Sequence, residues 1–181
     1  MSTESDDFIV VPFNPLPAEI DGPQALAKQK EYIRANILGK LNEDIVKNPT
    51  AKDLLCQLGS DLNINVFACN FRINGKVNED VEEANYLNNS IFHRLSITAP
   101  GILPETIPMF ISSSTFEYEH YGECVQHFKE RLGLEIESQQ DLFVLRNVVM
   151  TPFQTAGGFV QTIANIFQDV LVEEMQVGSD L

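Results

Sequence analysis

One stretch near the end of the chain constrains the fold most, because it is apolar on two alternating faces. It runs from Asp141 to Phe153 with the sequence DLFVLRNVVMTPF. Alternation places one apolar set on one face of a strand and a second set on the other, namely Leu142, Val144, Val148 and Met150 against Phe143, Leu145 and Val149. Such a strand is typical of the middle of a sheet that is covered on both sides. We therefore predict a central strand here.

The middle of this strand carries a cation, Arg146, where little water is expected. A buried guanidinium requires a carboxylate or phosphate partner. Two interpretations stay open from the residues alone. In the first, the partner is an internal Asp or Glu, or the side chain reaches solvent from an edge position. In the second, Arg146 holds an anionic ligand in the bidentate geometry that arginine favours.

Hydrophobic periodicity predicts alternating helices and strands along the rest of the chain. The predicted helices cover residues 23–38, 50–58, 80–96 and 121–132, with a last helix beginning at 157–158, and the predicted strands cover 62–73 and 109–116. Before them, Phe8 to Pro17 is apolar but contains three prolines. Because proline removes backbone donors, we predict that this segment is an extended arm or edge segment laid on an apolar surface.

Local signals mark the ends of several elements. Asn74-Gly75 directly follows the 62–73 strand and predicts a tight turn. Thr50 is the predicted cap of the second helix. Asp80 and Glu83 have the spacing of a capping box at the start of the third helix.

Composition narrows the class of partner. The net charge of −14 argues against nucleic acid and anionic membranes, because both would repel the chain. No apolar run approaches the ~20 residues of a membrane span, and the acidic start MSTESDDF does not resemble a secretory signal or transit peptide. The three cysteines, Cys56, Cys69 and Cys124, are predicted to be buried thiols of a reducing compartment. We expect a cytoplasmic globular protein.

Four segments carry a resemblance to a known family. LFVLRNVVMTPF, followed by an amphipathic helix, resembles the C-terminal end of the pyridoxal-phosphate group II amino-acid decarboxylases, which include glutamate and aromatic-amino-acid decarboxylases. SDLNINVFACNFR, GKVNEDVEEANYLNNSIFHRLSIT and YGECVQHFKERLGL resemble the fungal tyrosine-decarboxylase-like branch. The resemblance covers Phe8 to Met175 but only the family's C-terminal part. In glutamate decarboxylases the arginine of the matching strand binds the substrate carboxylate, and the resemblance implies this role for Arg146.

The resemblance also changes the expected fold. On pattern alone, alternating strands and helices would suggest a parallel α/β unit. The family's small domain instead implies an α+β fold, with a small antiparallel sheet, helices packed on one face, and an N-terminal extended arm and helices. We expect the arm and its helices to occupy residues 1–60 and the decarboxylase-like α+β region to occupy residues 61–181.

The residues for cofactor chemistry do not match the family. Its Schiff-base lysine follows a histidine, and this sequence contains no His-Lys pair. The other cofactor-binding groups belong to a large domain that the resemblance does not cover. We expect the chain alone to bind no cofactor, with pyridoxal phosphate entering only if another chain or domain completes the site.

Two histidines are weak acid–base candidates. His93 lies at the end of the predicted 80–96 helix, where a histidine more often interacts with the helix C-terminus. His120 lies in an acidic run that indicates a solvated turn. Neither belongs to a catalytic triad or a metal-ligand spacing, so the sequence assigns no catalytic residue and no metal site.

Three functional hypotheses follow. The first is a stand-alone small-domain homologue or truncated paralogue of a decarboxylase, with Arg146 as an inherited carboxylate-binding residue and no pyridoxal chemistry of its own. The second is a cofactor-free enzyme of a fungal biosynthetic pathway, an isomerase, cyclase or lyase with a pocket around Arg146. The third is a non-catalytic scaffold that forms a heterodimer with a full-length decarboxylase. We expect a homodimer or such a heterodimer, and a small acidic ligand.

Overall fold

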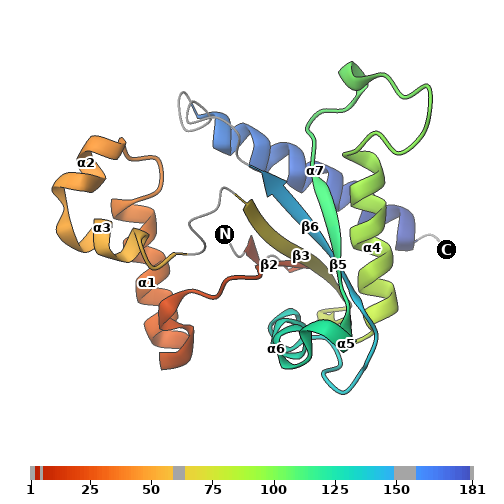
Figure 1. The fold of residues 1–181 in the computed structure, drawn as a ribbon, viewed down its shortest axis with the longest axis horizontal. Helices are drawn as coiled ribbons and strands as arrows, with labels where there is room; N and C mark the ends of the chain where they lie inside the picture. Colours follow the sequence, from red (N-terminus) through yellow and green to blue (C-terminus); the bar gives the residue numbers. More distant parts are fainter. Residues whose placement is uncertain (1–2, 5, 59–63, 149–157, 180–181) are drawn as a thin grey trace.

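The computed structural model describes residues 3–4, 6–58, 64–148 and 158–179 and shows an antiparallel sheet with helices around it (Figure 1). The strands are β1 (Thr3–Glu4), β2 (Phe8–Pro12), β3 (Ile64–Ile73), β4 (Lys76–Val77), β5 (Ser112–Phe116) and β6 (Leu142–Val148). The sheet order is β1-β2-β3-β6-β5, and β4 pairs with β3. Every strand pair is antiparallel, so the α+β prediction is confirmed and the parallel arrangement suggested by pattern alone is wrong.

Seven α-helices and two 3₁₀-helices connect the described strands. The α-helices are α1 (Pro23–Asn36), α2 (Asn42–Lys47), α3 (Pro49–Leu55), α4 (Val81–Arg94), α5 (Tyr118–Tyr121), α6 (Glu123–Leu132) and α7 (Phe159–Ser179). The 3₁₀-helices are η1 (Pro17–Asp21) and η2 (Pro104–Thr106). None of these described helices is both long enough and apolar enough to cross a membrane.

The predicted central strand is confirmed as β6. It lies between β3 and β5, with Phe67 opposite Leu145 on one side and Ser114 opposite Val144 on the other. The remainder of the predicted strand, from residue 149 to 153, lies outside the described residues.

The two faces of β6 contribute to two different hydrophobic clusters. Leu142 and Val144 pack in one cluster with the buried side of α6, formed by Val125, Phe128 and Leu132. Leu145, and beside it Phe143, pack in the other with α4 and α7 through Leu87, Ile91, Leu95, Val170 and Leu171. Thus α4 and α7 cover one face, as the resemblance implies, and the shorter α6 covers one end of the opposite face.

β3 and β6 pair over only part of their length, and α4 bonds to both strands beyond that point. Their pairing ends at Phe67 and Leu145. The side chain of Asn88 then accepts a hydrogen bond from the Cys69 N–H and donates one to the Cys69 carbonyl, both at 2.8 Å. These backbone groups are deeply buried and would otherwise have no partner from β6.

Asn85, one turn earlier on α4, bonds in the same way to backbone groups at the start of β6. Its Oδ1 accepts from the Phe143 N–H at 2.7 Å, and its Nδ2 donates to the Asp141 carbonyl at 2.8 Å. The two asparagines are three residues apart and therefore lie on the same side of the helix. They replace the missing hydrogen bonds between the strands and so fix α4 between the diverging strand ends.

The turn and the helix cap that the sequence predicts at the ends of elements are partly correct. Asn74 and Gly75 both have positive φ, at 54° and 78°, as a tight hairpin turn requires. Asp80 caps α4 by accepting from the N–H groups of Glu82 and Glu83. The reciprocal half of the capping box is absent, because the Asp80 N–H donates to the side chain of Asn78.

The predicted cap of the second helix is wrong. Proline is favoured in the first turn, so α3 begins at Pro49. The residue before it, Asn48, is the cap and accepts a hydrogen bond from the Ala51 N–H at 3.2 Å. Thr50 is therefore inside the helix. The cysteine prediction is also partly wrong, since Cys69 is buried but Cys56 and Cys124 are exposed.

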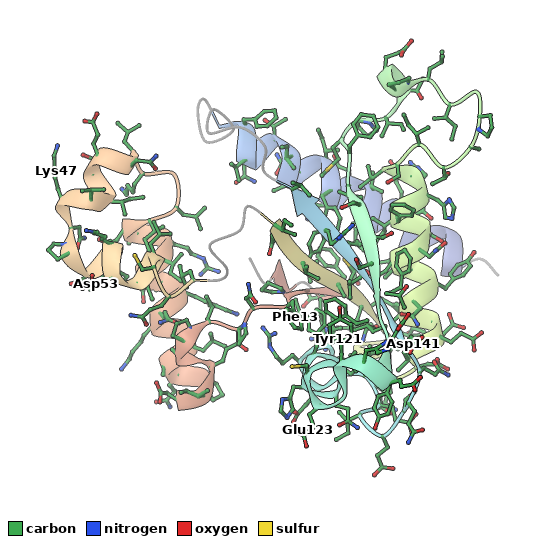
Figure 2. The ribbon with its side chains drawn as sticks, viewed as in Figure 1. Phe13, Lys47, Asp53, Tyr121, Glu123 and Asp141 are labelled. Carbon is green, nitrogen blue, oxygen red and sulfur yellow. The ribbon has the colours of Figure 1, made fainter. Side chains whose placement is uncertain are left out.

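The N-terminal segment contributes both to the sheet and to a separate helical group. Its apolar arm forms β2, which pairs with β3 from Phe8 opposite Phe71 to Pro12 opposite Phe67. Phe13 then packs edge-on against Phe116 and Phe128. The helices α1 to α3 lie to one side of the sheet (Figure 1), and Figure 2 places Lys47 and Asp53 on this group.

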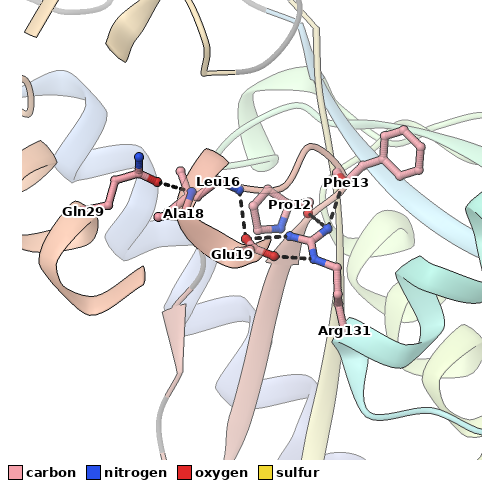
Figure 3. Close-up of polar contacts among 7 residues, drawn as sticks. All are labelled: Pro12, Phe13, Leu16, Ala18, Glu19, Gln29 and Arg131. Carbon is pink, nitrogen blue, oxygen red and sulfur yellow. Dashed lines mark hydrogen bonds and ion pairs between the residues drawn. The ribbon is translucent and has the colours of Figure 1, made fainter. Parts of the chain in front are cut away.

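Arg131 of α6 binds the segment where the N-terminal arm leaves the sheet. Its guanidinium pairs with both oxygens of Glu19 in η1, at 2.9 and 3.2 Å, and donates to the carbonyls of Pro12 and Phe13 (Figure 3). This bidentate, half-buried arrangement is the geometry in which an arginine–carboxylate pair contributes most. It holds the start of the helical group against the sheet.

Replacement of Asn88 tests the role of α4 between the strands. We expect Asn88→Ala to lower the free energy of unfolding by roughly 2–4 kcal/mol, because the buried N–H and C=O of Cys69 lose their partner. Chemical denaturation measures the change. Asn89→Ala is the matched control on the same helix, with an expected change within about 0.5 kcal/mol. Equal effects of the two substitutions would contradict the assigned role.

Candidate functional site

Arg146 lies on the open part of one sheet face. In the strand register it stands between Val66 of β3 and Ser112 of β5, whose side chains therefore share its face. Towards one end of the strand, Val144 and Leu142 are covered by α6. Towards the other end, Ile64 and Val148 face each other across the strands and are 39% and 49% exposed. The guanidinium thus stands where the covered half of the face meets the open half.

The side chain of Arg146 is half-buried and unpaired within the part of the chain that the structure describes. Its Nε is fully buried and has no hydrogen-bond partner. None of the described ion pairs includes Arg146. Two of the other arginines do pair with carboxylates, Arg131 with Glu19 and Arg94 with Glu173 and Glu174. The internal Asp or Glu of the first interpretation is therefore not found among these residues. A buried, unsatisfied donor of this kind is costly and calls for an explanation.

The surroundings of Arg146 suit an incoming anion. The neighbouring strand β5 carries short hydroxyl side chains, Ser112 and Ser114, on the same face. The Ser112 hydroxyl donates to the backbone carbonyl of Arg146 at 3.3 Å, which ties β5 to this part of β6. The planar fork of a guanidinium matches the geometry of a carboxylate.

The two histidine candidates lie on helices and contact their own neighbours. His93 is exposed in the last turn of α4, and its ring lies against that of Phe92, with 5.8 Å between centroids. His120 is exposed on α5, and its Nδ1 is bonded to the carboxylate of Glu117. The structure records no contact of either histidine with Arg146 among the described residues.

Lys129 is buried, so its surroundings are the most similar to those of a cofactor-binding lysine. It lies on the inner side of α6, and burial lowers the pKa of its ammonium, with an opposing effect from Asp141. Its Nζ donates to the carbonyls of Ser138 (2.9 Å) and Gln140 and lies 5.8 Å from the ring centre of Tyr118. The amine thus holds the loop that leads into β6.

The residues present therefore do not fit a covalently bound pyridoxal phosphate. The most buried amine is occupied by two backbone carbonyls, and Phe128, not a histidine, precedes it. Each of the other lysines in the sequence also follows a residue other than histidine. We assign no step of cofactor chemistry to this chain.

Sequence reasoning missed Asn85, Asn88 and Lys129. Each places a polar group on the inner side of a helix, Lys129 between Val125 and Leu132 of the buried side of α6. A polar residue inside an apolar stripe is the available signal, because it must find a partner when the helix packs. The sequence alone does not say whether that partner is backbone, side chain or ligand.

The fold defines a class, an α+β small domain with an antiparallel sheet, and its central strand carries an arginine that has no partner among the described residues. The family model described as tyrosine decarboxylase, C-terminal, matches residues 54–175, which is more than half of the chain. The chain therefore belongs to the tyrosine decarboxylase C-terminal family. No curated protein sequence gives a significant match.

A matched pair of arginine substitutions tests whether Arg146 is structural. Because Arg146 has no partner among the described residues, Arg146→Met should leave the free energy of unfolding unchanged or raise it by up to about 2 kcal/mol. Arg131→Met removes a bidentate pair and two carbonyl contacts, so it should lower this free energy by roughly 1–3 kcal/mol. Both values come from denaturant titration. Destabilisation by Arg146→Met as large as that of Arg131→Met would identify Arg146 as a structural ion-pair member.

Proposed function

We propose that this chain is a decarboxylase-type small domain that supplies Arg146 as a carboxylate-binding residue to a site completed by another chain or domain. The observation that carries the proposal is the buried, unsatisfied Nε of Arg146 on the open part of the sheet face. Natural proteins rarely leave a buried donor without a partner unless function requires it. A ligand carboxylate would satisfy the guanidinium with two parallel hydrogen bonds.

The proposal includes an incomplete site and a partner. The lysine environments given above do not suit a Schiff base, so we propose that the chain does not catalyse pyridoxal-phosphate chemistry alone. Ile64 and Val148, which are exposed, form an apolar border on one side of Arg146 along the strands. A second surface that covers this border would also exclude water from the carboxylate and so strengthen its bond to Arg146. A homodimer, or a heterodimer with a decarboxylase-like chain in the cytoplasm, is the assembly we propose.

A cofactor-free enzyme is less well supported. That function requires an acid–base residue beside Arg146, and His93 and His120 contact residues of their own helices. General acid–base catalysis needs hydrogen-bond reach to the reacting group. We therefore place carboxylate binding ahead of this alternative.

Titration with L-tyrosine and with tyramine, its analogue without a carboxylate, tests the proposal. We expect L-tyrosine to bind the chain at least about tenfold more tightly than tyramine, because a charge-assisted bond to Arg146 is available only to the carboxylate. Arg146→Gln should abolish this preference at the sheet face, where L-tyrosine no longer shifts the resonances of β5 and β6. Arg94→Gln is the control, since Arg94 is an exposed cation already paired with Glu173 and Glu174. Calorimetry or ligand-observed NMR measures the affinities.

Absorbance of the same samples with added pyridoxal phosphate tests the incomplete site. The proposal predicts that no Schiff-base absorbance band appears. It also predicts that borohydride reduction attaches the cofactor to no single preferred lysine. A reduced adduct on Lys129 would overturn the assignment of its amine to the two backbone carbonyls. Equal affinity for L-tyrosine and tyramine, unaffected by Arg146→Gln, would overturn carboxylate binding.

A further inference from the structure

A cleft of about 220 Å³ lies between the first helix and the arm that leaves the sheet. One wall is α1, and the other is the segment from Pro12 to Glu19, with Leu58 and Asn65 at the border. Most of these residues precede position 54, where the match to the decarboxylase family begins. The cleft is therefore largely outside the part of the chain that the family describes, and it does not include Arg146.

The walls of the cleft are fixed by hydrogen bonds. The side chain of Gln29 on α1 accepts from the Ala18 N–H of η1 at 3.0 Å, and Glu19 accepts from the Leu16 N–H at 2.9 Å (Figure 3). The Arg131 pair with Glu19 fastens the same segment to the sheet. A cleft held in this way is formed before a ligand arrives, which lowers the entropy cost of binding.

Lys30 occupies an unusual position in this cleft. It continues the apolar stripe of α1 that contains Leu26, Ile33 and Ile37, and it is half-buried. Arg34, one turn later, lines the same cleft at its exposed border. Among the residues described, neither cation has an ion pair with a carboxylate.

The carboxylate within the cleft does not neutralise these cations. Glu19 lines the cleft, but both of its oxygens are engaged by Arg131. The rest of the lining is largely apolar, with Pro15, Leu16 and Ile33 among it. The chain has a net charge of −14, so two cations without an ion pair among the described residues make the local charge of this cleft opposite in sign to that of the whole chain. They lie next to an apolar floor.

We propose that this cleft binds a small organic carboxylate with an apolar body. Lys30 binds the carboxylate at the inner end of the cation pair, Arg34 adds a second contact at the border, and the apolar body lies against Pro15, Leu16 and Ile33. An anion between the two cations gains charge-assisted hydrogen bonds beside an apolar wall that lowers the local dielectric constant. The site is separate from Arg146, so the two can be tested independently.

The test uses 3-phenylpropionate as the probe and 3-phenylpropionamide as its uncharged counterpart, with the full chain in NMR titrations. We expect Lys30→Gln to weaken 3-phenylpropionate binding about tenfold or more, and the amide to bind wild-type protein correspondingly weakly. Lys30→Arg, which keeps the charge, should retain most of the affinity. Lys28→Gln is the matched control, because Lys28 is an exposed lysine of the same helix that does not line the cleft.

Arg146→Gln separates this site from the proposed carboxylate site on the sheet. The cleft proposal predicts that in Arg146→Gln the resonances of α1 and the 12–19 segment still shift with 3-phenylpropionate, and that their midpoint of titration is unchanged. Absence of binding, equal affinity for acid and amide, or equal effects of Lys30→Gln and Lys28→Gln would each overturn it. A loss of binding in Arg146→Gln alone would assign the probe to the sheet site and also overturn the cleft proposal.

Discussion

The hydrogen bonds of Asn85 and Asn88 are the constraint on which the rest of the structure depends. They let α4 replace the missing pairing between β3 and β6, so the two strands diverge without leaving buried backbone groups unsatisfied. One end of α4 then packs in the cluster with α6, through Val81 and Ala84, and the rest packs with α7. The same helix therefore contributes to both hydrophobic clusters. Arg146 lies in the other half of β6, where this strand pairs with both β3 and β5.

The position of Arg146 follows from this division. Where β3, β6 and β5 stay paired, one face of the sheet has no described helix over it, and the arginine stands at the border of that region. Covering by an internal helix would have forced a carboxylate partner or an apolar residue at this position. A guanidinium without a partner among the described residues is compatible with a stable domain because it is only half-buried, and a carboxylate is the ligand that its planar fork fits best.

Much of the fold could be predicted from local patterns. Alternation identified β6, the Asn-Gly pair gave the hairpin turn after β3, and Asp80 gave the start of α4. Two misses are competitions between neighbouring residues: Pro49 takes the first turn of α3, so Asn48 and not Thr50 is the cap, and Asn78 takes the Asp80 N–H in place of Glu83. Local patterns cannot predict whether a carboxylate of the chain meets Arg146, because this depends on residues that only the sheet brings together; among the described residues none does.

The most direct test of the account is the ¹H–¹⁵N NMR signal of the Arg146 Nε–H, which can be resolved because the chain has few arginines. Because this Nε is buried and has no partner in the described part of the chain, we predict a slowly exchanging signal that moves strongly when L-tyrosine is added and stays in place when tyramine is added. The signals of Arg94 and Arg131, which already bond carboxylates, should change little. An Arg146 signal that already shows a strong hydrogen bond and does not respond to L-tyrosine would contradict carboxylate binding at this site.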